Sequence, residues 1–147
     1  MAFVADNSVI VAWFVKSQAT PYTWSILERA AAGEAIHVPL LWRQEFVNAM
    51  VVLERRRRLK AGDAAQAFTD LADVNLVFDR ELVGLDTLAD LARRLDLSAY
   101  DATYLELAMR LRLPLACRDG PLMAALPKAG VARARSPGRE TDDDQRR

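Results

Sequence analysis

The chain has 147 residues, of which 52% are hydrophobic, and 20 Lys and Arg residues balance 20 Asp and Glu residues. This length suits one domain with a sizeable buried core, and the composition excludes an intrinsically disordered chain. A protein that holds nucleic acid by bulk electrostatics is usually basic, so any nucleic-acid contact in this chain of zero net charge must be local.

Cysteine usage and hydropathy bear on the cellular compartment. The single Cys117 excludes an intrachain disulfide and suits a reducing cytosol. No apolar run reaches the roughly 18 residues of a membrane-spanning helix. The N-terminus has no basic region ahead of its apolar residues, and Asp6 interrupts them, so it is a poor signal peptide. We therefore expect a cytoplasmic protein without a membrane association.

The first elements are short. Residues 2–5 form an apolar run that predicts a buried strand, and residues 9–15 predict a short helix opened by Asn7 and Ser8. Asp6 lies between them. Taken alone, this aspartate is best explained as an N-cap that accepts a backbone N–H of the helix.

A second helix and a second strand follow. Thr20-Pro21 predicts a helix start with proline at the first position, and Gly33 predicts its end. We expect its apolar face to contain Trp24, Leu27 and Ala31. Residues 36–38 predict a strand. His37 within it has no His or Cys companion for a zinc site, so we expect a partly buried strand residue.

The longest helical pattern covers residues 40–59. Its apolar face is predicted to contain Trp42, Phe46, Ala49, Met50 and Leu53. Glu45 falls at the edge of that face, where a carboxylate can line a cleft, although the helix dipole also favours an acid near the first turn. Arg55 to Arg58 end the helix, and solvation with the C-terminal dipole explains these four cations better than an RNA-binding patch does.

The second half of the chain continues the alternation of helices and strands. The patterns predict helices over 64–71, over 82–95 and from Ser98 onward, strands over 74–78 and 113–117, and a short edge strand over 130–132. Such alternation is typical of a three-layer α/β domain with a mainly parallel central sheet flanked by helices. We assign this domain to residues 1–135 and expect residues 136–147 to be a disordered polar tail.

Four acids stand where elements begin or end: Asp6, Glu45, Asp101 and Asp119. Each has a structural explanation of its own, since Asp101 completes a capping-box pattern with Ser98, and Asp119-Gly120 resembles a turn. In a parallel sheet, however, the carboxyl ends of the strands and the first turns of the following helices can converge on one cleft.

Carboxylates brought together in this way would repel one another unless a cation compensates them. Mg²⁺ and Mn²⁺ prefer oxygen ligands, activate a bound water and neutralise charge on a phosphate. The lone histidine has no triad around it, and the glycine pattern of a P-loop is absent. The residues therefore predict metal-assisted hydrolysis of a phosphodiester.

At these residues the chain resembles the PIN-domain family, and within it the VapC-type toxins of bacterial toxin–antitoxin modules. The matching stretches are VADNSVIVAWF, PLLWRQEFVNAM, LSAYDATYLELA, and PLACRDGPLMAA followed by GV. They extend from residue 3 to residue 131. The resemblance implies a three-layer PIN-like fold and an endoribonuclease that depends on Mg²⁺ or Mn²⁺. It further implies a homodimer and an antitoxin whose tail blocks the cleft.

The resemblance also assigns roles to residues. Asp6 and Asp101 match the direct metal ligands, and Glu45 and Asp119 match acids that orient metal-bound water or complete the shell of a second ion. Ser8 and Asn48 match positions that support the site by hydrogen bonds. Where such proteins commonly carry Thr or Ser, two residues before the fourth acid, this chain has Cys117, and a thiol is a weaker hydrogen-bond partner than a hydroxyl.

Two other functions compete with the ribonuclease. A PIN-like module that binds RNA or a protein without cutting it would be consistent with Cys117 and the neutral net charge. A Mg²⁺-dependent phosphatase or phospho-acceptor domain would attack with an aspartate, often helped by a second acid two residues on. That position is Ser8 here, which disfavours this chemistry.

Overall fold

The computed structural model describes residues 1–137, and residues 138–147 lie outside the described part. The four strands of the described part are β1 Ala2–Ala5, β2 Ala35–Pro39, β3 Leu76–Asp79 and β4 Leu115–Ala116. The helices are α1 Asn7–Ala12, α2 Pro21–Ala31, α3 Leu41–Arg55, α4 Asp63–Leu71, α5 Leu85–Leu95, α6 Ala99–Leu111 and α7 Pro121–Ala129, with a 3-10 turn at Lys16–Gln18. None of these helices has the length and apolar content needed to cross a lipid bilayer.

The strands form one parallel sheet in the order β3-β2-β1-β4. In register, Phe3 lies opposite Ile36 on one side of β1, and Val4 lies opposite Leu115 on the other. The chain therefore builds outward from β1 to β3 and then returns to place β4 on the free side of β1. This return makes the β1–β4 junction the point where the strand order reverses.

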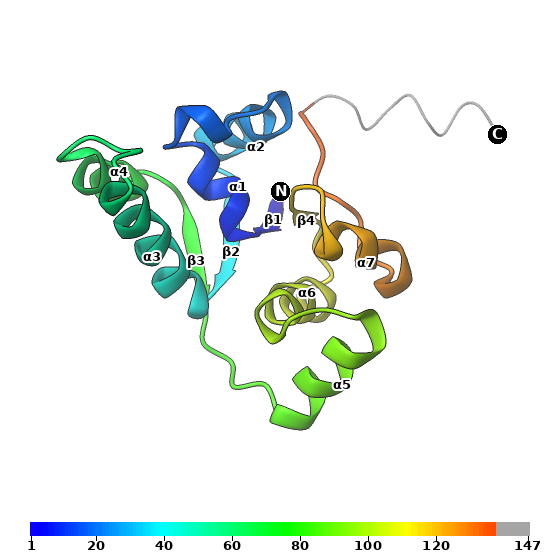
Figure 1. Ribbon diagram of the computed structural model, residues 1–147. Helices are drawn as coiled ribbons and strands as arrows, with labels where there is room; N and C mark the ends of the chain where they lie inside the picture. Colours follow the sequence, from blue (N-terminus) through cyan, green and yellow to red (C-terminus); the bar gives the residue numbers. More distant parts are fainter. Residues whose placement is uncertain (138–147) are drawn as a thin grey trace.

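Helices cover both faces of the sheet. Parallel crossovers are almost always right-handed, so the connections from β1 to β3 and the connection from β3 to β4 put their helices on opposite faces. Figure 1 shows this arrangement, with α1 to α4 on one side of the strands and α5 to α7 on the other. The predicted three-layer α/β fold with a mainly parallel sheet is confirmed, and the sheet is parallel throughout.

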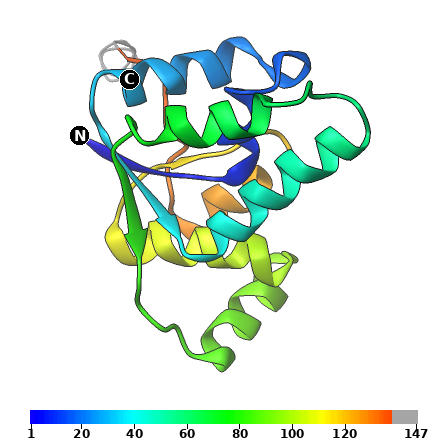
Figure 2. The same ribbon diagram turned by 90° about the vertical axis from the view of Figure 1, so that its left-hand side faces the viewer.

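The core lies where β1 and α6 meet. Phe3, Val4 and Ala5 are fully buried in the central strand, and Leu105 of α6 is fully buried against the sheet. On the other face, Trp42 stacks on Phe46 with ring centroids 5.2 Å apart. The predicted apolar face of α3 is confirmed, because its buried residues are Trp42, Phe46, Met50 and Leu53. Figure 2 shows α3 and α4 packed on this side of the strands.

The long helix ends earlier than predicted. It stops at Arg55 instead of residue 59, because Arg57 has a φ of 56°, which is left-handed and cannot continue a right-handed helix. The N–H groups of Arg57 and Arg58 close the last turn on the carbonyls of Glu54 and Leu53. Arg55 therefore belongs to the last turn of the helix, and Arg56 to Arg58 form an exposed turn after it.

One predicted helix face and one predicted helix start are wrong. In α2, Trp24 is 54% exposed, and Ile26 and Ala30 are buried instead. In α5 the predicted start at Leu82 is too early, since Leu82 is 97% exposed and the helix begins at Leu85. Gly84 has extended dihedral angles at the N-cap, so it precedes the helix and was misplaced inside it by the leucine spacing.

The short elements also differ from the prediction. The first helix occupies Asn7–Ala12 instead of 9–15, and the third strand occupies Leu76–Asp79 instead of 74–78. The strand predicted over 113–117 narrows to Leu115–Ala116, because Pro114 has no N–H to donate. The edge strand predicted over 130–132 is reduced to one parallel bridge between Leu115 and Arg133.

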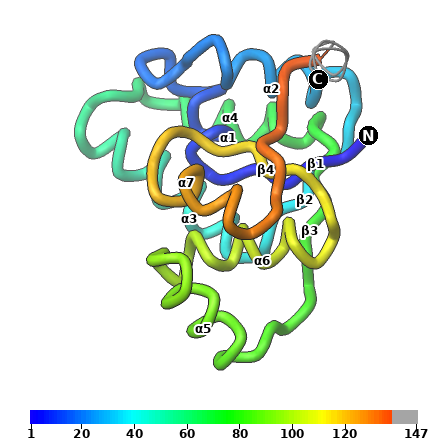
Figure 3. Tube along the Cα trace, turned by 90° about the vertical axis from the view of Figure 1, so that its right-hand side faces the viewer, coloured from blue at the N-terminus to red at the C-terminus, as the bar shows by residue number. Residues whose placement is uncertain are grey.

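Helix α7 was not predicted, although its start and end signals are present. Pro121 occupies its first turn, and Gly130 ends it with a φ of 68°, a conformation that glycine adopts without strain. Figure 3 shows α7 lying between α6 and the last segment of the chain. The tail predicted over 136–147 lies outside the described residues from 138 onward.

Candidate active site

The topology brings the strand ends that carry the predicted acids together. Asp6 follows β1 directly, and Asp119 follows β4, the neighbour of β1 in the sheet. Glu45 lies in the second turn of α3, which follows β2 on the other side of β1. In open parallel sheets, ligands gather beyond the carboxyl ends of the strands at the point where the strand order reverses. The acids stand at that point.

Two adjoining depressions contain the four acids. One, of about 300 Å³, is lined by Asp6, Asp101 and Asp119. The other, of about 380 Å³, is lined by Asp6 and Glu45. Asp6 and Ser8 line both, so Asp6 is the shared wall of one acidic cleft.

Asp6 takes the N-cap position of α1 but makes no capping bond with its side chain. Its carboxylate instead accepts a 2.6 Å hydrogen bond from the Ser8 hydroxyl. The predicted N-cap hydrogen bond is therefore not formed, and the side chain of Ser8 is the donor instead.

Asp101 uses its backbone and leaves its carboxylate available. Its N–H donates to the Ser98 hydroxyl at 3.1 Å, which caps α6 as predicted. The reciprocal half of a capping box is missing, since within residues 1–137 no hydrogen bond reaches the Asp101 carboxylate. The capping pattern thus explains Ser98 and leaves the Asp101 side chain in the cleft.

Glu45 is fixed from across the cleft by Tyr104. The Tyr104 hydroxyl donates to Glu45 Oε1 at 2.7 Å, and the tyrosine itself is 1% exposed. Tyr104 lies three residues after Asp101 on α6, so one helix contributes both a carboxylate and the donor that orients a second one. No role for Tyr104 was predicted, although this spacing on one helix face was visible in the sequence.

Burial raises the pKa values of three of the acids, and neighbouring carboxylates add to the rise for two of them. Burial raises the pKa of Asp6, and the Ser8 hydroxyl opposes that rise. Burial also raises the pKa of Glu45 and of Asp101, and the charge of Asp6 raises both further. Asp101 acts on Glu45 in the same direction. The cleft therefore concentrates negative charge that the described residues only partly compensate.

The remaining predicted residues lie at different depths. Asp119 forms a turn with Gly120 and is exposed at the mouth of the cleft. Cys117 is 1% exposed below the acids, and burial together with the charges of Asp6 and Asp101 raises its thiol pKa to about 11 despite the opposing Arg133. Asn48 is exposed on α3, and within residues 1–137 its side chain neither forms a hydrogen bond nor lines either depression.

Two polar neighbours of the predicted acids also line the cleft, although they were not predicted to do so. Arg118 is the one cation on the described walls of the two depressions, beside Asp119. Asn7 lines the depression of Glu45, and its Oδ1 is a buried acceptor without a partner in the described residues. Both directly follow or precede a predicted acid, so adjacency was the available signal.

The chemistry of this donor set fits a hard divalent cation. All the ionisable ligands that meet in the cleft are carboxylates, and Mg²⁺ binds through one or two of them together with waters and substrate phosphates. A closed zinc site would need a set of protein ligands around one point. Within residues 1–137, no three Asp, Glu, His or Cys side chains are grouped closely enough to hold an ion by themselves. The described residues therefore form no closed metal cage, and a cation held in the cleft would take its remaining ligands from water and substrate.

Comparison with known proteins gives a likeness of fold. No family model matches the chain, and no curated protein matches it. Among solved structures, the chain is similar to one described as the crystal structure of PAE2754 from Pyrobaculum aerophilum. The TM-score is 0.64, and the match covers 90% of this chain and 83% of that chain at 21% sequence identity. The two chains share a fold. At this identity the likeness carries no statement about activity.

Proposed function

We propose that this protein is a Mg²⁺- or Mn²⁺-dependent endoribonuclease of the PIN-domain type that acts as the toxin of a toxin–antitoxin pair. The observation that carries the proposal is the acidic cleft at the reversal point of the sheet, where Asp6 lines both depressions and is coupled by charge to Glu45 and Asp101. The family resemblance of the four sequence stretches supports the same reaction.

The chain's own residues would bind and orient in this reaction. Asp6 and Asp101 would hold the cation, and it would supply an activated water and neutralise charge on the phosphate. Tyr104 keeps Glu45 in one orientation through its 2.7 Å hydrogen bond, and Ser8 does the same for Asp6. Arg118 adds a fixed positive charge on the cleft wall, which favours a phosphodiester over a neutral substrate.

The decisive experiment replaces a carboxylate whose side chain forms no hydrogen bond or salt bridge within residues 1–137. Asp101→Asn keeps the backbone N–H that Ser98 accepts, so we expect a folded protein that has lost EDTA-sensitive cleavage of mixed RNAs in Mn²⁺. Asp73→Asn, an exposed aspartate outside the cleft, is the matched control and should cut at the parent rate. Equal cleavage by Asp101→Asn and the parent would contradict the proposal.

A second candidate function is a module that binds RNA or a protein without cutting it. The observation that favours it is the lack of three grouped metal-binding side chains in residues 1–137, together with the neutral net charge. The same assay separates the two functions. Reproducible products that EDTA abolishes exclude the binding module, and their absence with retained RNA binding excludes the nuclease.

The proposal includes protein partners and a location. A toxin of this type acts in the cytoplasm and has two partners, a second copy of the chain and an antitoxin that covers the cleft. Apolar side chains with no cover in the described part of the chain include Leu82, Leu85 and Tyr100, which are 97%, 85% and 61% exposed. A homodimer would bury such residues, and a charged substitution at Leu85 should then shift the protein to a monomer in size-exclusion chromatography.

A further inference from the structure

A second cavity lies at the opposite end of the sheet from the acids. It occupies about 710 Å³ where the chain enters β4, between the C-terminal ends of α6 and α7 and the final segment of the described chain. Its walls contain four arginines, namely Arg29, Arg112, Arg133 and Arg135, and no acidic residue. The chain as a whole has zero net charge, so the positive charge around this cavity is local and does not reflect the overall composition.

Three of these arginines carry charge without a paired carboxylate. Arg29 is neutralised by a salt bridge to Glu34 and donates Nη1 to the Arg135 carbonyl at 3.2 Å. Within residues 1–137, Arg112, Arg133 and Arg135 form no salt bridge. Cations around one cavity repel one another, and a bound anion would relieve that repulsion.

One of the three guanidinium groups is held in a fixed orientation. Arg133 lies over the ring of Tyr22, with its Cζ 3.7 Å from the ring centroid. Its Nε and Nη2 donate to the Cys117 carbonyl at 3.0 and 2.8 Å. Its Nη1 has no hydrogen bond in the described residues. A planar group fixed on two sides is preorganised for an anion, since less side-chain entropy is lost on binding.

These arginines are not explained by hydrogen bonds to the C-terminal carbonyls of the neighbouring helices. The last carbonyls of α6 and α7 are capped by backbone N–H groups, because Leu113 donates to Ala108 and Val131 donates to Leu126. Among residues 1–137, no arginine side chain of the cavity donates to these helix ends. The positive charge therefore remains available to a ligand.

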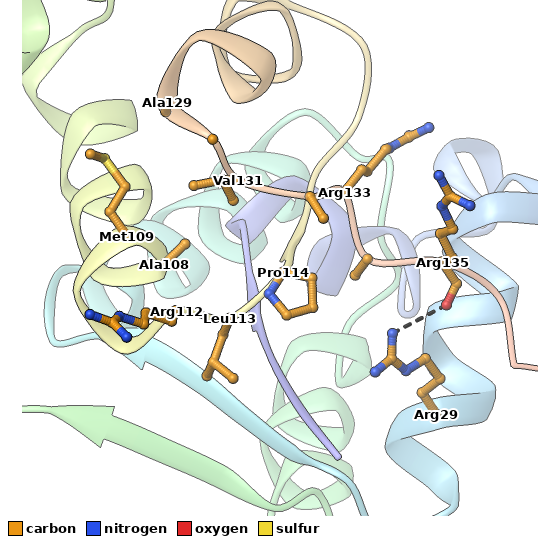
Figure 4. Close-up of a pocket in the computed structure, with 13 residues that line it drawn as sticks. Arg29, Ala108, Met109, Arg112, Leu113, Pro114, Ala129, Val131, Arg133 and Arg135 are labelled. Carbon is orange, nitrogen blue, oxygen red and sulfur yellow. Dashed lines mark hydrogen bonds between the residues drawn. The ribbon is translucent and has the colours of Figure 1, made fainter. Parts of the chain in front are cut away.

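The rest of the wall is apolar, which narrows the ligand class. Met109, Leu113, Pro114 and Val131 line the space between the arginines. Figure 4 shows Arg112 beside Met109 and Leu113 on one side, with Arg29, Arg133 and Arg135 on the other. A ligand that fits this wall has a phosphate and a flat, weakly polar body. Arginine also forms bidentate hydrogen bonds with phosphate oxygens and with the edge of guanine.

We propose that the cavity bordered by Arg112, Arg133 and Arg135 binds a nucleotide phosphate, either as a free nucleotide or as one nucleotide of an RNA strand. The phosphate lies against Arg133 and Arg135, and the base lies over the apolar wall toward Arg112. This site is separate from the acidic cleft, and the proposal does not depend on RNA cleavage.

Equilibrium binding tests the proposal on the full chain in EDTA, so that metal-dependent cleavage cannot consume a probe. Calorimetry measures the binding of guanosine 5′-monophosphate. Fluorescence anisotropy measures the binding of a fluorescein-labelled RNA tetranucleotide. The test variant is Arg112→Asn/Arg135→Gln. Asparagine tolerates the left-handed backbone of Arg112, whose φ is 56°, and the Arg135 carbonyl that Arg29 uses is unchanged.

We expect the double variant to weaken binding by about tenfold or more, since it removes two charge-assisted contacts. The matched control is Arg80→Gln/Arg93→Gln, which removes the same charge from exposed arginines outside the cavity and should bind as the parent does. Binding of both probes would assign a free nucleotide, and binding of the tetranucleotide alone would assign a nucleotide within RNA.

Two results would overturn the proposal. One is the absence of saturable binding of either probe to the parent chain, and the other is equal binding by the parent and the double variant. If the double variant loses its circular dichroism signal, Val131→Glu replaces it. This change puts a carboxylate on the apolar wall of the cavity and should abolish binding of both probes, and unchanged binding would equally overturn the site.

Discussion

Tyr104 is the residue whose side chain ties the two helices of the acidic cleft together. Its hydroxyl is the one donor to the Glu45 carboxylate in residues 1–137, and the ring is buried in the core. Burial and the adjacent carboxylates raise the pKa of Tyr104, so the hydroxyl stays protonated and continues to donate. The position of Glu45 therefore depends on a group that is neutral at every physiological pH.

Tyr104→Phe tests this dependence. The variant leaves a partly buried carboxylate without its donor, so we expect the free energy of unfolding to fall by about 1.5–3 kcal/mol, the usual range for a hydrogen bond to a charged group. The pKa of Glu45 should rise further, because the Tyr104 hydrogen bond lowers it in the parent. Urea unfolding and NMR titration measure the two effects. Tyr100→Phe, on the exposed side of the same helix, should change neither.

Cys117 should be unreactive in the folded protein. Its thiol is 1% exposed, and its pKa of about 11 leaves almost no thiolate near neutral pH, although the thiolate is the reactive form. We expect alkylation by iodoacetamide to be slow in the native state and fast in urea. A native rate equal to the rate in urea would show that the segment below the acids opens readily.

At the scale of the element, α6 determines how the cleft is assembled. One capped helix start places Asp101, and the next turn places Tyr104 against Glu45. Ser98→Ala removes the N-cap and should lower the free energy of unfolding by about 1 kcal/mol. Ser17→Ala, which removes an exposed serine that forms no side-chain hydrogen bond in residues 1–137, should have little effect in the same chemical denaturation experiment.

The elements that position the site were predictable, and those at its periphery were less so. Residues 2–5, the apolar face of α3 and the Ser98 cap of α6 follow from short, strong patterns, and each occurs as expected. Helix α7 was not predicted because Asp119-Gly120 was interpreted as a turn and residues 130–132 as an edge strand. The face of α2 was wrong because Trp24 suggested a buried position, whereas tertiary packing chose Ile26 and Ala30.

The site itself was predicted as a set of residues, and the only internal contacts expected were supporting hydrogen bonds from Ser8 and Asn48. The order of strands brings Asp6, Glu45, Asp101 and Asp119 to one cleft, which sequence patterns could only anticipate from the general behaviour of parallel sheets. The Ser8 and Tyr104 hydrogen bonds depend on side-chain rotamers and on the distance between α3 and α6. The family resemblance pointed to Ser8, and the sequence contains no direct signal for the Tyr104 hydrogen bond.

At the scale of the whole molecule, the cleft couples stability to pH. The folded-state pKa values of Asp6, Glu45 and Asp101 are raised, so the folded chain binds protons more tightly than the unfolded chain does. Their contribution to stability is present at low pH and is lost as pH rises from 3.8, the ordinary pKa of aspartate, through the raised values.

Asp101→Asn removes one of these three carboxylates, and with it the part of the destabilisation at neutral pH that the Asp101 charge causes. We expect the variant to gain melting temperature relative to the parent in EDTA, and the gain should grow as pH rises through that window. Added Mn²⁺ should raise the melting temperature of the parent, because a ligand that binds only the folded state stabilises it, and should raise that of the variant less. Differential scanning calorimetry in EDTA and in Mn²⁺ measures both. A variant less stable than the parent at neutral pH would contradict the repulsion described here.

The strand order also determines when during synthesis the cleft can exist. β1 leaves the ribosome first and pairs with β2 on one edge, but its other edge must wait for β4, near the end of the chain. Domains form progressively as the nascent chain emerges. A polypeptide interrupted before β4 can carry Asp6 and Glu45 on a partial sheet but lacks Asp119. Incomplete translation products would therefore not carry the assembled acidic cleft.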